Sequence, residues 1–472
     1  MNFKKPILSI ILVVSASLSF GQKATQTKRL DSLFTSLAAQ NQFSGSVLIA
    51  EKGKVIYKTG RGYSNEETKA LNNPQTIFEL ASCSKQFIGV AIALLHRENK
   101  LNYTDDITVH IPELSSFKGV TVYDLLRHTS GIPEYLFGEF TNDWKNERIA
   151  TNEDVIAYYA ARKDSLEFAP HSAHQYTNTN YVFLATIIER VSGQKLNDYL
   201  TQKIFKPLKM NRTFIYNRRF EPKKIKNYAT GYVWINNSFE KAPEDDKRVG
   251  RMVPYYLDGI VGNAKVNSTV EDLYKWMEAL KNNQLLTRQE FDEVMEITKT
   301  ADGEKVSYGF GFEVRKNGAN ISYGHTGSWD GYITFMYYSS VNDRTILVLN
   351  NFKNGVCAYE TMNEILDDKP TSKEFIKKVP LTEEKIKSFV GEYTNPEDPS
   401  QKHIISYLDG HLVYNTDKLN WDMRFFPSSE NTFQAIRQGG TDGAIKFTPQ
   451  SDGTMKLEMT QYGQVIGNGI RN

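Results

Sequence analysis

The chain has 472 residues, a formal net charge of +2 and 24% charged residues, so it is long enough for more than one domain. This near-neutral balance comes without a long basic block, which removes the positive stripe that nucleic acids require, so we expect no nucleic-acid partner. Only two cysteines occur, Cys83 and Cys357, too few for a disulfide-rich scaffold.

The first residues have the pattern of a secretory signal peptide. Lys4 and Lys5 precede a short apolar run over residues 7–20, and Gly21 provides a small residue for cleavage. The run is shorter than the roughly 20 residues of a membrane-spanning helix. We therefore expect a signal peptide over residues 1–21, a periplasmic or secreted protein, and no membrane span after cleavage.

Two short strands around a turn at Gly53 are predicted within residues 46–57. The next signal is Ser82-Cys83-Ser84-Lys85, followed by residues 87–95, which are apolar on all sides and indicate a buried helix. Three residues along a helix return to the same face, so Lys85 is expected beside Ser82. Because a serine hydroxyl is a weak nucleophile without a neighbouring base, this pair predicts a serine nucleophile with a lysine partner. A helix N-terminus also favours developing negative charge.

Cys83 also has nucleophile chemistry, but one residue along a helix it points about 100° away from the face of Ser82 and Lys85. We interpret it as a small buried apolar side chain. Whether it pairs with Cys357 in an oxidising compartment is left open by their spacing.

Two further motifs match Ser82 in chemistry and in chain order, Tyr176-Thr177-Asn178 and His325-Thr326-Gly327. Each motif is unspecific alone, since Ser-x-x-Lys recurs at Ser115, Ser192 and Ser238 and Tyr-x-Asn at Tyr63 and Tyr393. Only the set around Ser82 combines a helix, the chain order and the flanking sequence. Together the three motifs predict a serine acyl-transfer site.

With residues 125–133 (Leu-Leu-Arg-His-Thr-Ser-Gly-Ile-Pro), 184–193 and 268–276, these motifs resemble the serine β-lactamase and penicillin-binding superfamily in its class C-like branch. The resemblance covers about residues 40–365. It implies a mixed α+β (α/β) fold: an antiparallel sheet flanked by helices and an all-helical lobe, with the site in the cleft between them.

The resemblance also implies roles for the catalytic groups. Ser82 would attack a carbonyl and become acylated, with Lys85 taking its proton. Tyr176 would relay a proton to the leaving group, either as a phenolate stabilised by the lysine charge or through a hydrogen bond to Lys85. The backbone N–H groups of Ser82 and Ser328 would form the oxyanion hole.

Substrate binding is implied for Asn178, which would hold an amide or acyl side chain, and for His325, Thr326 and Gly327 on the far side. His325 stands where class C β-lactamases have lysine, and an ordinary histidine is mostly neutral at pH 7. The histidine therefore argues against a β-lactam as the substrate. If the His325 charge binds a carboxylate, affinity should rise below about pH 6.5.

The loop Phe168-Ala169-Pro170-His171-Ser172 departs from the usual Pro-Gly of the family. Its histidines, with His174, either line the site or belong to a different surface turn, and we favour the turn. The spacing matches no zinc motif, and we expect no metal and no cofactor.

A polar, proline-containing stretch over residues 366–373 suggests a domain break. After it, six short strands are predicted over residues 390–393, 403–407, 411–414, 433–436, 444–447 and 455–459, with turns at Asp409-Gly410 and Asp452-Gly453. This pattern predicts a small antiparallel barrel or sandwich and resembles a lipocalin-like domain. The domains are thus a hydrolase domain over 22–368, a linker over 369–385 and a small β domain over 386–472, whose role in ligand binding, gating, oligomerisation or stability stays open.

The sequence therefore predicts an exported serine hydrolase that acts through a Ser82 acyl-enzyme on a small peptide, amide or ester. A class C-like β-lactamase is one alternative. A penicillin-binding or sensor protein that no longer turns over is another. The oligomeric state is not readable from the sequence.

Overall fold

The computed structural model describes residues 24–39, 41–144, 148–235, 238–241, 255–352, 355–371, 379–408, 411–415, 423–436, 442–461 and 464–471. The chain divides into two compact units. One comprises residues 44–355 with the short segment 415–422, and the other the residues up to 43 with 356–414 and 423–472. The expected signal peptide lies outside the described residues.

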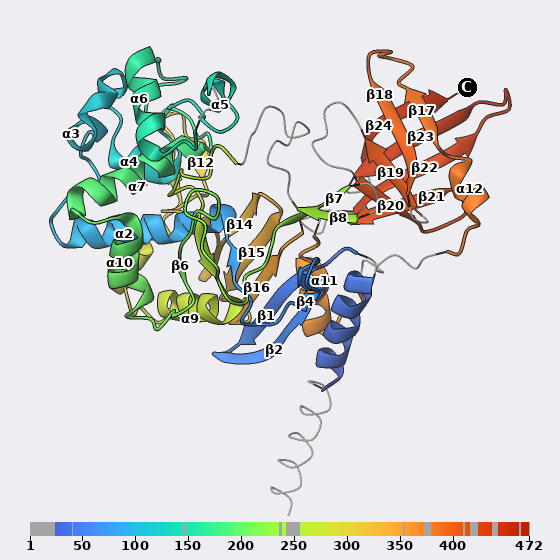
Figure 1. Ribbon diagram of the computed structural model, residues 1–472, viewed down its shortest axis with the longest axis horizontal. Coiled ribbons are helices and arrows are strands. Elements are labelled where there is room, and N and C mark those ends of the chain that lie inside the picture. Colours follow the sequence, from blue (N-terminus) through green and yellow to red (C-terminus); the bar gives the residue numbers. More distant parts are fainter. Residues whose placement is uncertain are drawn as a thin grey trace, which may run out of the picture. The chain divides into compact units, whose positions relative to one another are not determined.

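The first unit is centred on an antiparallel sheet of six strands (Figure 1). Their order is β13 (Glu313–Asn317), β14 (Asn320–Trp329), β15 (Tyr332–Ser339), β16 (Arg344–Asn350), β1 (Gly45–Glu51) and β2 (Lys54–Arg61). Strands β1 and β2 form the hairpin predicted over residues 46–57. Helix α9 (Val270–Lys281) packs on β1 and β16 and has a buried face that includes Leu273 and Trp276.

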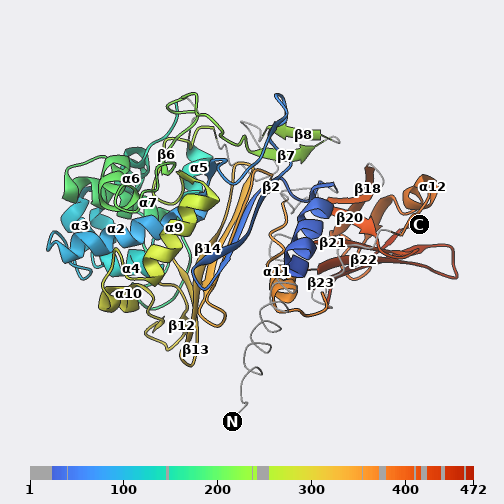
Figure 2. The same ribbon diagram turned by 90° about the horizontal axis from the view of Figure 1, so that it is seen from below.

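A helical lobe lies on one side of this sheet (Figures 1 and 2). Its central helices, α2 (Lys85–Arg97) and α7 (Asn178–Ser192), pack against each other. Every residue of α2 from Lys85 to Leu95 is buried, which explains why the sequence is apolar on all sides there. The lobe also contains α3 (Ile107–His110), η2 (Pro112–Phe117), α4 (Val122–Arg127), α5 (Glu139–Asp143), α6 (Asn152–Arg162), α8 (Leu196–Leu200), η3 (Thr201–Phe205) and α10 (Arg288–Val294).

Short strands form further small sheets in this unit. Strands β5 (Phe78–Glu79), β10 (Val266–Ser268) and β6 (Phe214–Ile215) form a three-stranded sheet next to the start of α2. Two-stranded pairs are β3 (Tyr63–Asn65) with β4 (Ala70–Leu71), β7 (Tyr232–Ile235) with β8 (Ser238–Lys241), and β11 (Thr298–Lys299) with β12 (Lys305–Val306). None of the helices within the described ranges combines the length and apolar composition needed to cross a membrane.

The second unit contains a helix over residues 24–39, α11 (Tyr359–Leu366), α12 (Glu383–Lys387) and a closed barrel. The barrel strands are β17 (Gly391–Thr394), β18 (Lys402–Leu408), β19 (His411–Asn415), β20 (Met423–Pro427), β21 (Thr432–Ile436), β22 (Asp442–Pro449), β23 (Met455–Gln461) and β24 (Gln464–Arg471). The α+β class with a small added barrel is thereby confirmed. Strands β20 and β24 were not predicted from the sequence, and β24 carries two glycines, Gly467 and Gly469, that weaken a strand signal.

Aromatic rings pack together inside the barrel unit. Phe389, which follows α12, stacks on Phe447 at 4.6 Å between ring centroids and lies 5.4 Å from Phe433. All three side chains are buried. This part of the barrel is therefore a packed core, as in small barrels whose interior side chains fill the space.

Candidate active site

Ser82 lies in a tight turn, η1 (Ala81–Ser84), between β5 and α2. Leu80 anchors the turn, because its N–H donates to the Val266 carbonyl at 2.8 Å and its carbonyl accepts from Thr334 Oγ1 at 2.8 Å. Ala81 adopts a left-handed conformation with φ of 49°, which costs a residue with a Cβ on the order of 1 kcal/mol. The turn leaves Ser82 partly exposed at the start of α2.

Lys85 is the first residue of α2, and its side chain is fully buried. Its Nζ lies 3.2 Å from Ser82 Oγ, 2.9 Å from Asn178 Oδ1 and 2.9 Å from the Asn263 carbonyl oxygen. A neutral amine has two N–H donors and one lone pair, and the two carbonyl oxygens can take both donors. The lone pair is then free to accept the Ser82 hydroxyl proton.

The electrostatics of Lys85 suit this arrangement. Burial lowers its pKa from 10.5 to about 7, and the Glu134 carboxylate opposes the shift without cancelling it. A buried amine loses the hydration that stabilises its charged form. A large fraction of Lys85 is therefore neutral near pH 7 and able to act as a base.

Tyr176, two residues before α7, presents its ring to this lysine, with Lys85 Nζ 4.9 Å from the ring centroid. Although 38% of the residue is exposed, burial of its hydroxyl raises the pKa of Tyr176 far above 10, while contact with Ser82 opposes the rise. The lowering expected from a lysine charge is thus reversed, because burial penalises the charged phenolate and dominates the pKa of Tyr176. Tyr176 is a phenol here, a proton donor rather than a phenolate.

Asn178 begins α7 and is almost fully buried. Its Oδ1 accepts from Lys85, while its backbone N–H and its Nδ2 both donate to Glu134 Oε2, at 2.7 and 3.0 Å. Its amide, expected to bind substrate, therefore also connects Lys85 to Glu134. Glu134 was not predicted from the sequence, although it directly follows the stretch 125–133 that carried the resemblance.

Strand β14 brings the His325-Thr326-Gly327 motif against the nucleophile turn. A Cβ placed on Gly327 would lie 2.5 Å from the Leu80 carbonyl oxygen and 3.1 Å from the Ser82 backbone nitrogen. Only glycine allows this close backbone approach. Thr326 and Ser328, on either side of it, are exposed.

His325 is buried, with 3% of the residue exposed. Its Nδ1 faces the Thr326 carbonyl oxygen, so this nitrogen carries the proton, and its Nε2 accepts from Tyr308 Oη at 2.9 Å. Burial lowers the pKa of His325 to about 4. The ring is therefore neutral near pH 7, and both of its nitrogens have protein partners.

The other candidate residues from the sequence are Cys83, His171 and His174. Cys83 is a buried free thiol whose Sγ contacts the His325 carbonyl oxygen at 3.1 Å, and burial raises its pKa to about 12. It is thus unreactive and not joined to Cys357. His174 is partly buried, with its ring centroid 6.4 Å from that of Tyr308, whereas His171 is exposed.

Close backbone packing holds α2 in place. A Cβ on Gly89 would lie 2.0 Å from the Phe310 carbonyl oxygen, and a Cβ on Gly311 would lie 2.3 Å from the Lys85 carbonyl oxygen. Gly311 also has a φ of 83°, which favours glycine. The loop over residues 308–312 therefore sits directly on the first turns of α2.

A buried ion network surrounds the site. Lys265 Nζ contacts Asp258 Oδ1 at 2.7 Å and Glu79 Oε1 at 3.2 Å. Asp330 contacts Arg218 at 2.6 Å and Arg219 at 2.5 Å, and although burial alone would raise its pKa, these arginines lower it to about 2. Glu79, Lys265 and Asp330 lie close in sequence to Ser82, Asn263 and Ser328 respectively. The network thus joins the segments that carry the site.

Known proteins share this architecture. A family model described as Beta-lactamase matches residues 30–364. Penicillin-binding protein 4* of Bacillus subtilis (strain 168) is 35% identical over 333 residues, 70% of this chain and 72% of that protein.

Solved structures agree on the fold. The octameric penicillin-binding protein homologue from Pyrococcus abyssi covers 94% of this chain and 99% of its own, with a TM-score of 0.63 and 24% identity. A D-amino acid amidase from Ochrobactrum anthropi SV3 covers 74% and 96%, with a TM-score of 0.57 and 21% identity. At these identities the structural similarity shows the fold alone, whereas the family model and the Bacillus relative decide the family: this chain belongs to the β-lactamase family of serine β-lactamase-related and penicillin-binding proteins.

Proposed function

We propose that this protein is an exported serine hydrolase that acts through a Ser82 acyl-enzyme on a small peptide, amide or ester. The observation that carries the proposal is the environment of Lys85. Its Nζ lies 3.2 Å from Ser82 Oγ while two carbonyl oxygens accept its N–H groups. This is the arrangement of an activated serine nucleophile and its base.

The reaction follows from these contacts. Neutral Lys85 takes the Ser82 hydroxyl proton as Oγ bonds to the substrate carbonyl carbon. The charge that develops on the carbonyl oxygen is met by the backbone N–H groups of Ser82 and Ser328. When the bond to the leaving group breaks, Tyr176 gives its phenolic proton to that group and recovers one from Lys85. Water then releases the acyl group from Ser82.

Export is supported by the signal-peptide pattern of residues 1–21. A periplasmic or secreted location follows from it. The family match over residues 30–364 supports a hydrolase domain close to the limits 22–368, followed by a linker over 369–385 and the β domain over 386–472.

The substrate class has support from two directions. A relative named as a penicillin-binding protein and a structural neighbour named as a D-amino acid amidase both favour amide bonds. The neutral, internally bonded ring of His325 lacks the fixed cation that would hold a β-lactam carboxylate. Recognition of penicillin without efficient hydrolysis is therefore the second candidate, supported by the Bacillus relative.

The test is to incubate the mature protein with a penicillin and with a fluorophosphonate, recording its intact mass over time and the drug concentration. We expect a covalent adduct with the fluorophosphonate that disappears in Ser82→Ala. A long-lived penicillin adduct would favour a peptidase-like pocket, and rapid drug consumption without an adduct would favour a β-lactamase. Fluorophosphonate labelling that persists in a folded Ser82→Ala variant would overturn the proposal.

A further inference from the structure

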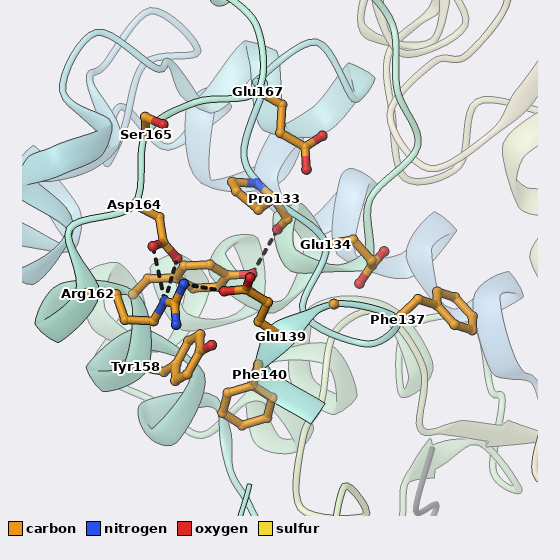
Figure 3. Close-up of a pocket in the computed structure, with 12 residues that line it drawn as sticks. Pro133, Glu134, Phe137, Glu139, Phe140, Tyr158, Arg162, Asp164, Ser165 and Glu167 are labelled. Carbon is orange, nitrogen blue, oxygen red and sulfur yellow. Dashed lines mark hydrogen bonds and ion pairs between the residues drawn. The ribbon is translucent and has the colours of Figure 1, made fainter. Parts of the chain in front are cut away.

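Glu134 lies in the loop between α4 and α5 and uses both carboxylate oxygens as acceptors. Its Oε1 accepts from the Leu136 backbone N–H at 2.7 Å. Its Oε2 accepts from the backbone N–H and from Nδ2 of Asn178. Figure 3 shows Glu134 on the wall of a cavity of about 430 Å³, together with Glu167.

These contacts decide which way the Asn178 amide faces. Because Nδ2 is bound to Glu134, Oδ1 is left to face Lys85 Nζ at 2.9 Å. The reversed amide would place its NH₂ against the lysine N–H and its carbonyl oxygen against a carboxylate. Both contacts would be repulsive, so the carboxylate selects one orientation.

We propose that Glu134 is a positioning residue for the Ser82 reaction: its carboxylate fixes the Asn178 amide so that Oδ1 holds Lys85 Nζ beside the Ser82 hydroxyl. The inference rests on the proposed function and extends it to a residue that does not itself touch Ser82. Three hydrogen bonds separate Glu134 from the nucleophile, through Asn178 and Lys85.

The role requires a carboxylate rather than an amide of the same shape. In Glu134→Gln, one of the two side-chain oxygens becomes an NH₂ group. That group would face either the Leu136 N–H or the two Asn178 donors, so one donor would meet another donor. Loss of the Asn178 contacts would release the amide, and loss of the Leu136 contact would tilt the side chain.

The charge of Glu134 gives the test a second readout. The titratable or charged groups around Lys85 lie on several elements: Cys83 on η1, Glu134 in its loop, His128 after α4, Tyr176 and Tyr181 at α7, and His325 on β14. Glu134 is the carboxylate that raises the pKa of Lys85. Burial raises the pKa of Glu134 itself, and its hydrogen bonds from Asn178 and Leu136 oppose that rise by stabilising the carboxylate. Its neutralisation should therefore move the pKa of Lys85 downward, and the acid limb of the reaction should move to lower pH.

The experiment measures how fast a fluorophosphonate labels Ser82 in the full chain between pH 5 and 9, by intact mass. We expect Glu134→Gln to label about 10- to 100-fold more slowly at high pH, the size expected when a charge-assisted hydrogen bond is lost. The pH at which labelling reaches half of its maximal rate (the midpoint) should also be lower in Glu134→Gln than in the wild type. A merely destabilised protein would lose amplitude without moving the midpoint.

Glu167→Gln is the matched control, because Glu167 lines the same cavity but pairs with Gln175 at 2.7 Å and is exposed. We expect it to keep the wild-type rate and midpoint. Glu134→Asp keeps the charge but draws both oxygens back by one methylene, so we expect slower labelling and a midpoint between those of the wild type and Glu134→Gln. This variant decides the question if Glu134→Gln does not fold, since labelling at the wild-type rate in Glu134→Asp would contradict the proposal.

A double-mutant cycle tests whether Glu134 acts through Asn178. Asn178→Ala should slow labelling, and adding Glu134→Gln should slow it no further. If the two substitutions slow labelling independently, so that their effects multiply, the positioning role is overturned. It is also overturned if Glu134→Gln keeps the wild-type rate and midpoint. Absence of Ser82 labelling in the wild type would instead refute the proposed function, so the two failures are distinguishable.

Discussion

Two buried lysines in this protein, Lys85 and Lys265, have opposite electrostatics. Lys85 is fully buried and Lys265 is 2% exposed. Burial lowers the pKa of Lys85 to about 7, whereas at Lys265 the carboxylates of Asp258 and Glu79 outweigh burial and raise the pKa. Burial is the same at both sites, so the identity of the partners decides the protonation state.

The difference teaches how the fold separates a base from a structural cation. The carbonyl oxygens of Asn178 and Asn263 orient the Lys85 side chain. They stabilise its positive charge less than a carboxylate in direct contact would. The nearest acid in its hydrogen-bond chain, Glu134, stands behind Asn178. At Lys265 the two acids make direct contact. The same side chain is thus suited to accept a proton in one place and belongs to a charged framework in the other.

The largest expected effect comes from removing the base. Lys85→Met should slow Ser82 labelling by about 10²- to 10⁴-fold, the usual range for a lost general base. The fold should survive, because a neutral side chain of similar length replaces one that is largely neutral. Labelling kinetics by intact mass give the rate, and circular dichroism checks the fold. A rate near that of the wild type would remove Lys85 from the mechanism.

Removing the structural cation should act on stability first. Lys265→Met leaves Asp258 and Glu79 buried without their cation and should cost about 3–5 kcal/mol. Chemical unfolding monitored by fluorescence measures the loss. Lys58→Met is the matched control: Lys58 pairs with Glu271 at the surface, with 49% and 31% of the two side chains exposed, so its loss should cost less than about 1 kcal/mol.

The pH dependence separates the two lysines directly. Protonated Lys85 has no lone pair, so labelling of Ser82 should rise about tenfold per pH unit below a midpoint near 7 and level off above it. Lys265 has a raised pKa and should not contribute to this increase of the labelling rate with pH. A labelling rate that is level from pH 5 to 8 would show that Lys85 is not the titrating base.

The smallest effect is expected at His325. The pKa of His325 is lowered to about 4, so its ring stays neutral between pH 5.5 and 8. Its titration should therefore change the inhibition constant of a substrate-like carboxylate by less than about twofold over this range. The increase below pH 6.5 considered from the sequence is therefore not expected. The test measures the inhibition constant as a function of pH and corrects it for the titration of Lys85. A steep increase in affinity below pH 6.5 would show that a charged His325 binds the carboxylate.

The sequence predicted the groups that lie close along a helix or within a motif. Ser82 and Lys85 are three residues apart, and their contact follows from helical spacing, here through the 3₁₀ turn η1 that leads into α2. The hairpin at residues 46–57 and most barrel strands follow from local patterns. Glu134, Asn263 and Tyr308 could not be found in this way, because their roles arise from contacts with residues far away in the chain.

Protonation states were equally hidden. The sequence suggested that a charged lysine lowers the pKa of Tyr176, but burial acts on both groups and reverses the outcome. Likewise, the neutral state of His325 depends on its burial in the fold. Such properties belong to the three-dimensional environment and not to the motif.

The glycine contacts of α2 have a consequence for motion. With backbone oxygen atoms closing over Gly89 and facing Gly311, a sliding or rolling movement of α2 would press main chain onto main chain. We therefore expect the helix that begins at Lys85 to keep its position when a substrate binds. Any opening or closing that accompanies substrate entry must then be sought in the loops that face Ser82 and not in a piston-like movement of its helix.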